Sequence, residues 1–194
     1  MNSEYYSDIP PSMLKNKRIL EVGSGYGKNQ LLSRHRDIFL HADYIGYDLF
    51  LQQKPLLNIV ASDIRNVEFE KESFDVILIM HCIEHIPIED WAKLLDKLVC
   101  ALRVGGWFVI AAPYNESEKR PYDSRHIVFD INENMLAAYF PRIRLYRSSI
   151  YYPRYTGVRK LIWWSRRFFR GDRVVPLGIL RMSFIGFWKK EIEQ

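Results

Sequence analysis

Three glycines within five residues, directly after a short apolar run, constrain the fold of this chain more than any other feature. The run over residues 18–23 (RILEVG) predicts a buried strand, and Gly23, Gly25 and Gly27 then lead into a helix-like stretch over 28–36. A strand, a glycine turn and a helix begin a βαβ unit, and glycines let a ligand approach the backbone closely. A tight turn alone explains one of these glycines easily and three with difficulty.

The two best-known phosphate-binding glycine loops fit this segment poorly. A dinucleotide loop of the GxGxxG type needs its third glycine at position 28, where this chain has Lys28. A Walker A loop needs Ser or Thr after its lysine, and Asn29 follows instead. The loop therefore predicts a ligand that lies against the backbone without an obligatory phosphate.

The rest of the chain alternates between strand and helix patterns. Further strands are predicted over residues 42–48, 57–63, 74–80, 107–112, 142–151 and 179–188. An amphipathic helix is predicted over 88–103 and ends at Gly105-Gly106, and Pro113 is expected to end the strand that follows. The run 74–80 (FDVILIM) is apolar almost throughout, as is typical of a central parallel strand covered on both faces. This alternation predicts an α/β protein.

Two acids stand at the ends of successive predicted strands. Asp48 ends the strand 42–48, and Asp63 ends the strand 57–63. In an open α/β sheet, ligands bind beyond the carboxyl ends of the strands. There Asp48 can accept both hydroxyls of a ribose, and Asp63 can accept an exocyclic amine. Either acid alone is more often a helix or turn cap, but together with the glycine loop they predict a nucleoside pocket.

The ordered set of these segments resembles the class I S-adenosylmethionine-dependent methyltransferases. The matching segments are, in order, ILEVGSGYG, YIGYD, ASDI, FDVILIMHCIEHI and LRVGGWFVIAAP, and they cover roughly residues 15–140. The IEHI ending is similar to the small-molecule branch often called type 11. The resemblance implies a Rossmann-like, doubly wound, mostly parallel sheet whose last two strands form an antiparallel hairpin. The length of 194 residues suits one domain, so a single methyltransferase domain over residues 1–194 is expected.

The resemblance implies S-adenosylmethionine as cofactor, S-adenosylhomocysteine as product, and no metal. The cofactor-binding residues that it implies are Glu21, Gly23, Ser24, Gly25, Tyr26, Asp48, Leu49, Asp63, Ile64, Met80 and His81. Within this set, Asp48 would bind the ribose, and Asp63 and the Ile64 N–H would bind the adenine edge. His81 departs from many relatives, in which the position is acidic or small and polar, and a contact through its backbone carbonyl would survive this change of side chain.

Methyl transfer from a sulfonium is an in-line displacement, so positioning and desolvation supply most of the catalysis. A hydroxyl acceptor must also lose its proton, for which histidine is the usual base. His126 is the first candidate, because its loop follows the fifth strand and should overhang the pocket; alternatively, it only ties the loop down. Glu84 and His85 are further catalytic candidates, or they cap the helix that follows. His35 and His41 are expected at the surface.

Positive charge is concentrated at the C-terminal end of the chain. Residues 151–194 hold 10 of the 28 Lys and Arg residues but 3 of the 23 Asp and Glu residues. A basic aromatic insertion is predicted at about 152–178, between the last two strands, and its stretch 155–170 is YTGVRKLIWWSRRFFR. This stretch fits a helix docked on the sheet, an interfacial helix on an anionic membrane, or, less well, a binding site for nucleic acid.

The sequence thus predicts an enzyme that methylates an oxygen of a small-molecule, sugar or lipid-linked acceptor. The alternatives are a non-catalytic cofactor-binding scaffold that docks on a membrane or a partner, and a tRNA or RNA methyltransferase. No signal-peptide pattern and no apolar run long enough to span a bilayer is visible, so a cytoplasmic protein, peripheral on the membrane, is expected. Cys82 and Cys100 are expected to be buried thiols. The oligomeric state stays open.

Overall fold

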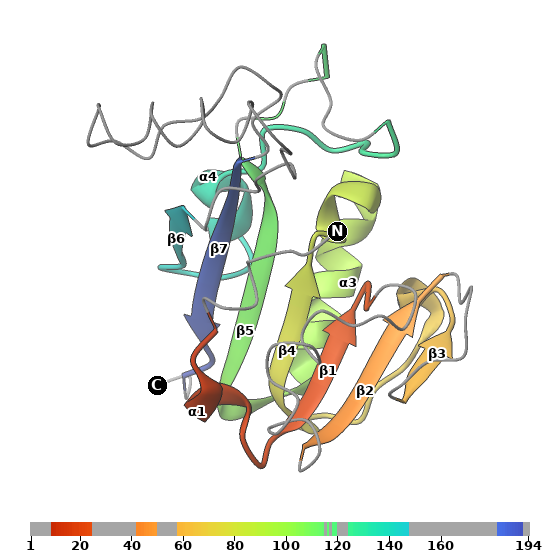
Figure 1. Ribbon diagram of the computed structural model, residues 1–194, viewed down its shortest axis with the longest axis vertical. Helices are drawn as coiled ribbons and strands as arrows, with labels where there is room; N and C mark the ends of the chain where they lie inside the picture. The colour runs from red at the N-terminus through yellow and green to blue at the C-terminus, as the bar shows by residue number, and fades with distance from the viewer. Residues whose placement is uncertain are drawn as a thin grey trace, which may run out of the picture.

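One mostly parallel sheet organises the molecule (Figure 1). The computed structural model describes residues 9–24, 42–49, 58–114, 116, 118–119, 124–147 and 182–191. The strands are β1 (Arg18–Val22), β2 (Asp43–Asp48), β3 (Ile59–Ala61), β4 (Phe74–Met80), β5 (Leu102–Tyr114), β6 (Arg144–Arg147) and β7 (Met182–Lys189). Their order in the sheet is β3-β2-β1-β4-β5-β7-β6, with β1 to β5 parallel and β7 antiparallel to both of its neighbours. The predicted fold class, including the antiparallel C-terminal pair, is confirmed.

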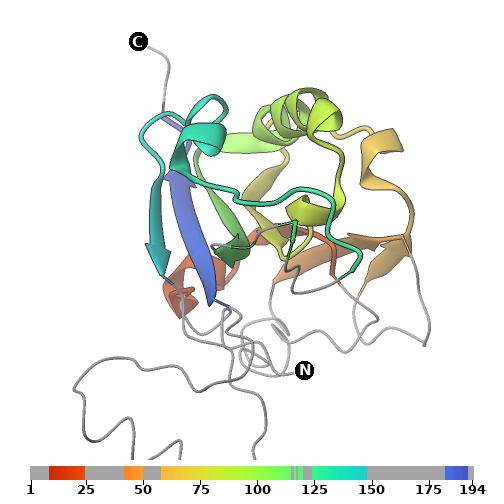
Figure 2. The same ribbon diagram turned by 90° about the horizontal axis from the view of Figure 1, so that it is seen from above.

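Both faces of the sheet carry an apolar core. The described helices are α1 (Pro11–Leu14), α3 (Ile88–Ala101) and α4 (Glu133–Ala137), with the short 3-10 turns η2 (Ile64–Asn66) and η3 (Ile83–His85). Figure 2 shows α3 and α4 on one face and α1 on the other. Successive residues of β4 alternate between the two cores: Ile77 and Ile79 pack with α3, and Leu78 packs with the α1 side. This double coverage explains why the run 74–80 is apolar.

Two predicted boundaries around β5 are wrong. The helix ends at Ala101, short of the predicted 103, because Leu102 already pairs with Phe74 of β4. The register shifts after this pair, and Gly105, with φ +78°, lies in the shifted stretch and does not end the helix. Pro113 does not end the strand either. It lies beyond Ala111, the last β5 residue that pairs with β4, and pairs only with Ser183 of β7. With a neighbouring strand on one side only, the missing N–H of the proline is tolerated.

Several predictions fall outside the described residues. They are the helix over 28–36, Gly25, Tyr26 and the basic aromatic insertion at about 152–178. The single-domain assignment of the chain stays a prediction. Within the described ranges, no helix has the length and apolar character that crossing a bilayer requires.

Candidate functional site

The carboxyl ends of the parallel strands bring the glycine turn against the turn that follows β4. Gly23 comes directly after β1 and has φ +73°, a conformation that favours glycine. A Cβ atom at this position would lie 2.5 Å from the Cβ of Cys82. Position 23 therefore requires glycine for two reasons, its backbone angle and the close approach of Cys82.

Carboxylates surround this contact. Glu21 is fully buried near the end of β1 and accepts a hydrogen bond from the Tyr44 hydroxyl at 2.5 Å. Asp48 ends β2, and the Leu49 side chain beside it is 57% exposed. Burial raises the pKa of the Cys82 thiol well above its usual range, and the nearby carboxylates, Glu84 and Asp48 foremost, raise it further. The thiol stays neutral among these acids, and the negative potential here suits a cationic ligand.

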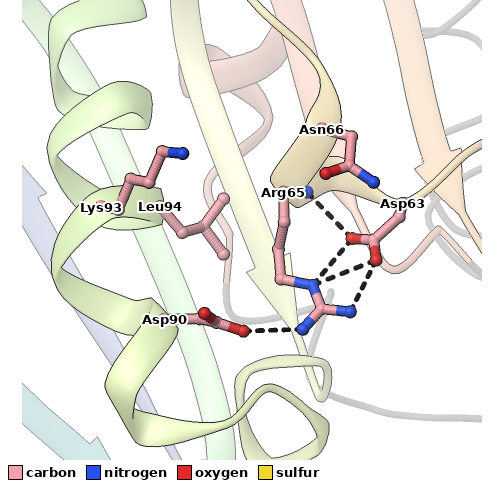
Figure 3. A pocket seen from close by; sticks show the side chains of 6 residues that line it. All are labelled: Asp63, Arg65, Asn66, Asp90, Lys93 and Leu94. Atoms are coloured by element: carbon pink, nitrogen blue, oxygen red, sulfur yellow. Dashed lines mark hydrogen bonds and ion pairs between the residues drawn. The ribbon is translucent and has the colours of Figure 1, made fainter.

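Asp63 forms local contacts at the end of β3 (Figure 3). Its carboxylate accepts hydrogen bonds from the Arg65 backbone N–H at 3.0 Å and from the guanidinium at distances down to 2.6 Å. These bonds lower the pKa of Asp63, and Arg65 also reaches Asp90 at 2.6 Å. A cavity of about 230 Å³ is lined by Asp63, Arg65, Asn66, Asp90, Lys93 and Leu94. Asp63 therefore caps η2, and its contact with adenine stays a prediction, as does that of the Ile64 N–H.

The chain turns sharply after β4. Met80 is the last strand residue and is buried, and His81 follows with φ +54°, which is uncommon for a residue other than glycine. The His81 N–H donates to the Ala111 carbonyl at 2.8 Å, and its Nδ1 lies 3.3 Å from Glu84 Oε1. The turn thereby directs η3 across the carboxyl edge of the sheet.

The three predicted catalytic residues lie together above this turn. Glu84 is 1% exposed, and its carbonyl accepts hydrogen bonds from the N–H groups of Ile127 and Val128 at 3.0 and 3.1 Å. Figure 2 shows the loop before α4 crossing this edge. His126 Nε2 consequently lies 3.8 Å from Glu84 Oε1, and the His126 and His85 rings are 4.8 Å apart, edge to face.

Glu116 completes the cluster, and the sequence analysis missed it. Its side chain is buried, and its two oxygens lie 2.8 and 2.7 Å from His126 Nδ1. Its carbonyl accepts a hydrogen bond from the Asp130 N–H at 3.1 Å, which holds the loop at its far end. An acid two residues beyond the end of β5, at the edge where ligands bind, was the signal that could have identified it.

The sequence comparisons point to one kind of protein. Residues 2–168 match the profile of a family described as "Methyltransferase domain". The chain is 37% identical over 121 residues to the phthiotriol/phenolphthiotriol dimycocerosates methyltransferase of Mycobacterium leprae, a match covering 55% of this chain and 42% of that protein. It is 33% identical over 120 residues to a probable phthiotriol/phenolphthiotriol dimycocerosates methyltransferase of Mycobacterium ulcerans, covering 55% and 43%. The chain thus matches less than half the length of these relatives.

Solved structures share the fold. A SAM-dependent methyltransferase from Archaeoglobus fulgidus superposes with a TM-score of 0.65 at 16% identity, covering 93% of this chain and 89% of that one. The phosphoethanolamine N-methyltransferase 2 of Haemonchus contortus, in complex with S-adenosyl-L-methionine, gives 0.61 at 18% identity, covering 91% and 49%. At 16–18% sequence identity, these superpositions show a shared fold.

Proposed function

Since the chain belongs to the class I S-adenosylmethionine-dependent methyltransferases, which are enzymes, we propose that it methylates a hydroxyl of a lipid-linked, sugar or other small-molecule acceptor. S-adenosylmethionine supplies an electrophilic methyl group when bound. The observation that carries the proposal is the buried Glu116–His126 pair beside Glu84, at the edge of the sheet where α/β proteins bind their ligands.

The residues present fit the cofactor. The close approach of Gly23 to Cys82 leaves backbone without a side chain at the turn, and Glu21 and Asp48 place carboxylates at the ends of neighbouring strands. A cationic sulfonium is favoured by this negative potential. Glu21, Gly23 and Ser24 would hold the methionine end, Asp48 the ribose and Leu49 the adenine face.

The histidine cluster favours an oxygen acceptor. Glu116 accepts the Nδ1 proton of His126, so the lone pair of the neutral ring lies on Nε2. Nε2 can accept a proton from a hydroxyl, and the carboxylates of Glu116 and Glu84 stabilise the resulting imidazolium. A neutral amine attacks through its own lone pair and needs no base beforehand. A buried His–Glu pair therefore accelerates methylation of a hydroxyl more than methylation of an amine.

Exposed apolar side chains beside the cluster favour an acceptor with an apolar part. Ile127, next to His126, is 53% exposed, and Ile88, which begins α3, is 52% exposed. The two mycobacterial relatives are named for dimycocerosates, which agrees with a lipid-linked acceptor. The basic aromatic stretch 155–170 supports a peripheral membrane location on the cytoplasmic side, an argument that comes from its sequence alone.

Transfer of label from tritiated S-adenosylmethionine tests the proposal. The purified protein is incubated with the cofactor and, separately, with an organic lipid extract, a water-soluble extract and total RNA. We expect label in the lipid or small-molecule fraction, removed by His126→Gln. Label in RNA would support the RNA methyltransferase alternative, and binding of S-adenosylhomocysteine without any transfer would support the scaffold.

Sedimentation with liposomes tests the membrane location separately. The protein is mixed with anionic and with neutral vesicles, and recovery in the pellet is compared. Enrichment with the anionic vesicles is expected, because Arg side chains pair with anionic headgroups while Trp and Phe enter the interface. Equal recovery in both supernatants contradicts it.

A further inference from the structure

We propose that Glu84, His85 and His126 form a binding site for one divalent transition-metal ion. One candidate ligand atom from each residue lies within 4.8 Å of those of the other two. Two imidazoles and one carboxylate are a common ligand set for such ions, with coordination positions left for a substrate. This proposal departs from the expectation of no metal that the family resemblance gave.

The hydrogen bonds of the two histidines leave Nε2 of each neutral ring as an acceptor. His126 Nδ1 lies 2.7 Å from Glu116 Oε2, and His85 Nδ1 lies 3.1 Å from the Arg125 carbonyl oxygen. Both partners only accept, so each neutral ring donates from Nδ1 and keeps a lone pair on Nε2. Metal-binding histidines are held in this way, with the other ring nitrogen bonded to a carboxylate or a carbonyl.

The carboxylate between them lacks a donor. Glu84 is 1% exposed, and within the described ranges its Oε2 has no hydrogen-bond partner. A buried carboxylate oxygen without a partner is costly, and two imidazole lone pairs beside it add acceptors and no proton. A divalent metal ion bonded to all three groups would satisfy these acceptors together. Oε1 lies 3.3 Å from His81 Nδ1, which leaves Oε2 for the ion.

The spacing requires a small contraction on binding. Bonds of about 2.0–2.2 Å place tetrahedral ligand atoms about 3.3–3.6 Å apart. His126 Nε2 lies 3.8 Å from Oε1 of the same carboxylate whose Oε2 faces the ion, and the ligand atoms of the three residues all lie within 4.8 Å of one another. Side-chain rotation can close that difference, because His85 and Glu84 share the short turn η3 and His126 lies on a loop bonded to it. Imidazole ligands favour Zn²⁺, Co²⁺ or Fe²⁺ over Mg²⁺ and Ca²⁺.

A metal here would deepen the proposed function, on which this role rests. A hydroxyl bound to a divalent ion becomes far more acidic, so it loses its proton to solvent near neutral pH. His126 would then act as a ligand, and Glu116 as the residue that orients it. The metal site itself depends only on the three side chains and their surroundings.

Metal titration of the purified full chain tests the site directly. The protein is stripped with a chelator and titrated with Zn²⁺ by calorimetry, and with Co²⁺ by visible absorption, which reports the ligand field. We expect one equivalent per chain and at least about tenfold weaker binding in Glu84→Gln, His85→Ala and His126→Ala. The matched controls are Asp96→Asn, an exposed acid on α3, and His35→Ala, a histidine elsewhere in the chain. Circular dichroism confirms that each variant folds.

The outcomes separate this inference from the proposed function. Absence of binding in the wild type, or equal affinity in Glu84→Gln and Asp96→Asn, overturns the metal site. S-adenosylhomocysteine is titrated into the same proteins as an independent measurement. Metal binding that depends on Glu84, together with no affinity for S-adenosylhomocysteine, would uphold the site and overturn the proposed function.

Discussion

The two edges of the sheet use acidic residues in opposite ways. At the amino edge of the parallel strands, Asp43 pairs with Arg18 at 3.1 Å and Asp75 pairs with Arg103 at 3.1 Å. The Asp43 side chain is 72% exposed. At the carboxyl edge, Glu21, Glu84 and Glu116 are no more than 2% exposed. Glu21 accepts from a tyrosine, and the other two face histidines.

Under the proposed function, the difference separates acids that hold the fold from acids that serve a ligand. An exposed acid beside an arginine contributes at most about 1 kcal/mol and is satisfied without any further group. Burying a carboxylate costs several kcal/mol unless partners compensate for lost water. Three such acids lie at the carboxyl edge, and the proposed function gives their charge a role there. The predictions below contrast the two edges.

Replacing His126 should have the largest effect. His126→Ala removes the group that accepts the acceptor proton or binds the metal, and we expect the methyl-transfer rate to fall by about 10²–10⁴-fold. Arg103→Ala at the amino edge is the matched change and should leave the rate within about twofold, because it removes only an exposed ion pair and a hydrogen bond to the Glu72 carbonyl, both far from the carboxyl edge. The rates are measured with tritiated cofactor at saturation. Similar losses in both variants would mean that the contrast between the edges has no functional meaning.

Strand β2 carries its own internal comparison. Asp48 ends the strand and Asp43 begins it. Asp48→Ala should weaken S-adenosylhomocysteine binding at least about tenfold, because charge-assisted hydrogen bonds contribute about 1.5–3 kcal/mol each. Asp43→Ala loses an exposed ion pair and should bind as the wild type does. Calorimetric titration gives both affinities, and equal affinities would remove Asp48 from the cofactor site.

Glu116→Gln should lower the transfer rate by about 10–100-fold, as removal of an outer partner of a functional histidine does. The amide can donate as well as accept, so it no longer fixes the proton on His126 Nδ1. A purely structural role would change stability alone. We therefore expect an altered pH profile of the rate, with S-adenosylhomocysteine affinity unchanged. An unaltered profile would leave Glu116 as a support of the loop.

The sequence predicted the sheet well because its signals are local. The apolar run of β4 coincides with the predicted 74–80, and the turn at Gly23 is where the glycine pattern places it. The errors arise where tertiary pairing overrides local preference. Leu102 leaves the helix for a pair with Phe74, and Pro113 is accepted where only β7 lies beside it. Cys100, expected to be buried within its apolar run, is exposed on the outer side of α3.

The candidate site was predicted in part. Glu84, His85 and His126 were named because each lies near the end of a strand, and the structure places them together. The pairing of Glu116 with His126 could not be predicted, because no sequence motif links an acid after β5 to a histidine ten residues later. The hydrogen bonds that fix the two rings are equally invisible to the sequence, because they depend on how the loop crosses η3.

Asp63 lies at the carboxyl edge but pairs with an arginine, as the acids of the amino edge do. Its substitution therefore tests the contrast between the two edges, with the smallest expected effect. Arg65 lowers the pKa of Asp63 below its usual 3.8, so the pair stabilises the fold above that pH. The contribution is lost as the pH falls through the lowered pKa. Arg65→Met removes the ion pairs with both Asp63 and Asp90, so it should reduce the free energy of unfolding by at most about 2 kcal/mol at neutral pH, and by less below pH 3.8.

Urea unfolding at the two pH values measures this difference, and Asp63→Asn completes the test through S-adenosylhomocysteine affinity. If Asp63 only pairs with Arg65, Asp63→Asn binds S-adenosylhomocysteine as the wild type does. In that case the burial of an acid, and not its place at the carboxyl edge, would mark it as functional. A tenfold weaker affinity would show instead that Asp63 contacts adenine while Arg65 orients it. The Asp63–Arg65 ion pair would then belong to the cofactor site. Acids at the carboxyl edge would differ from those at the amino edge in function, whether or not they are buried.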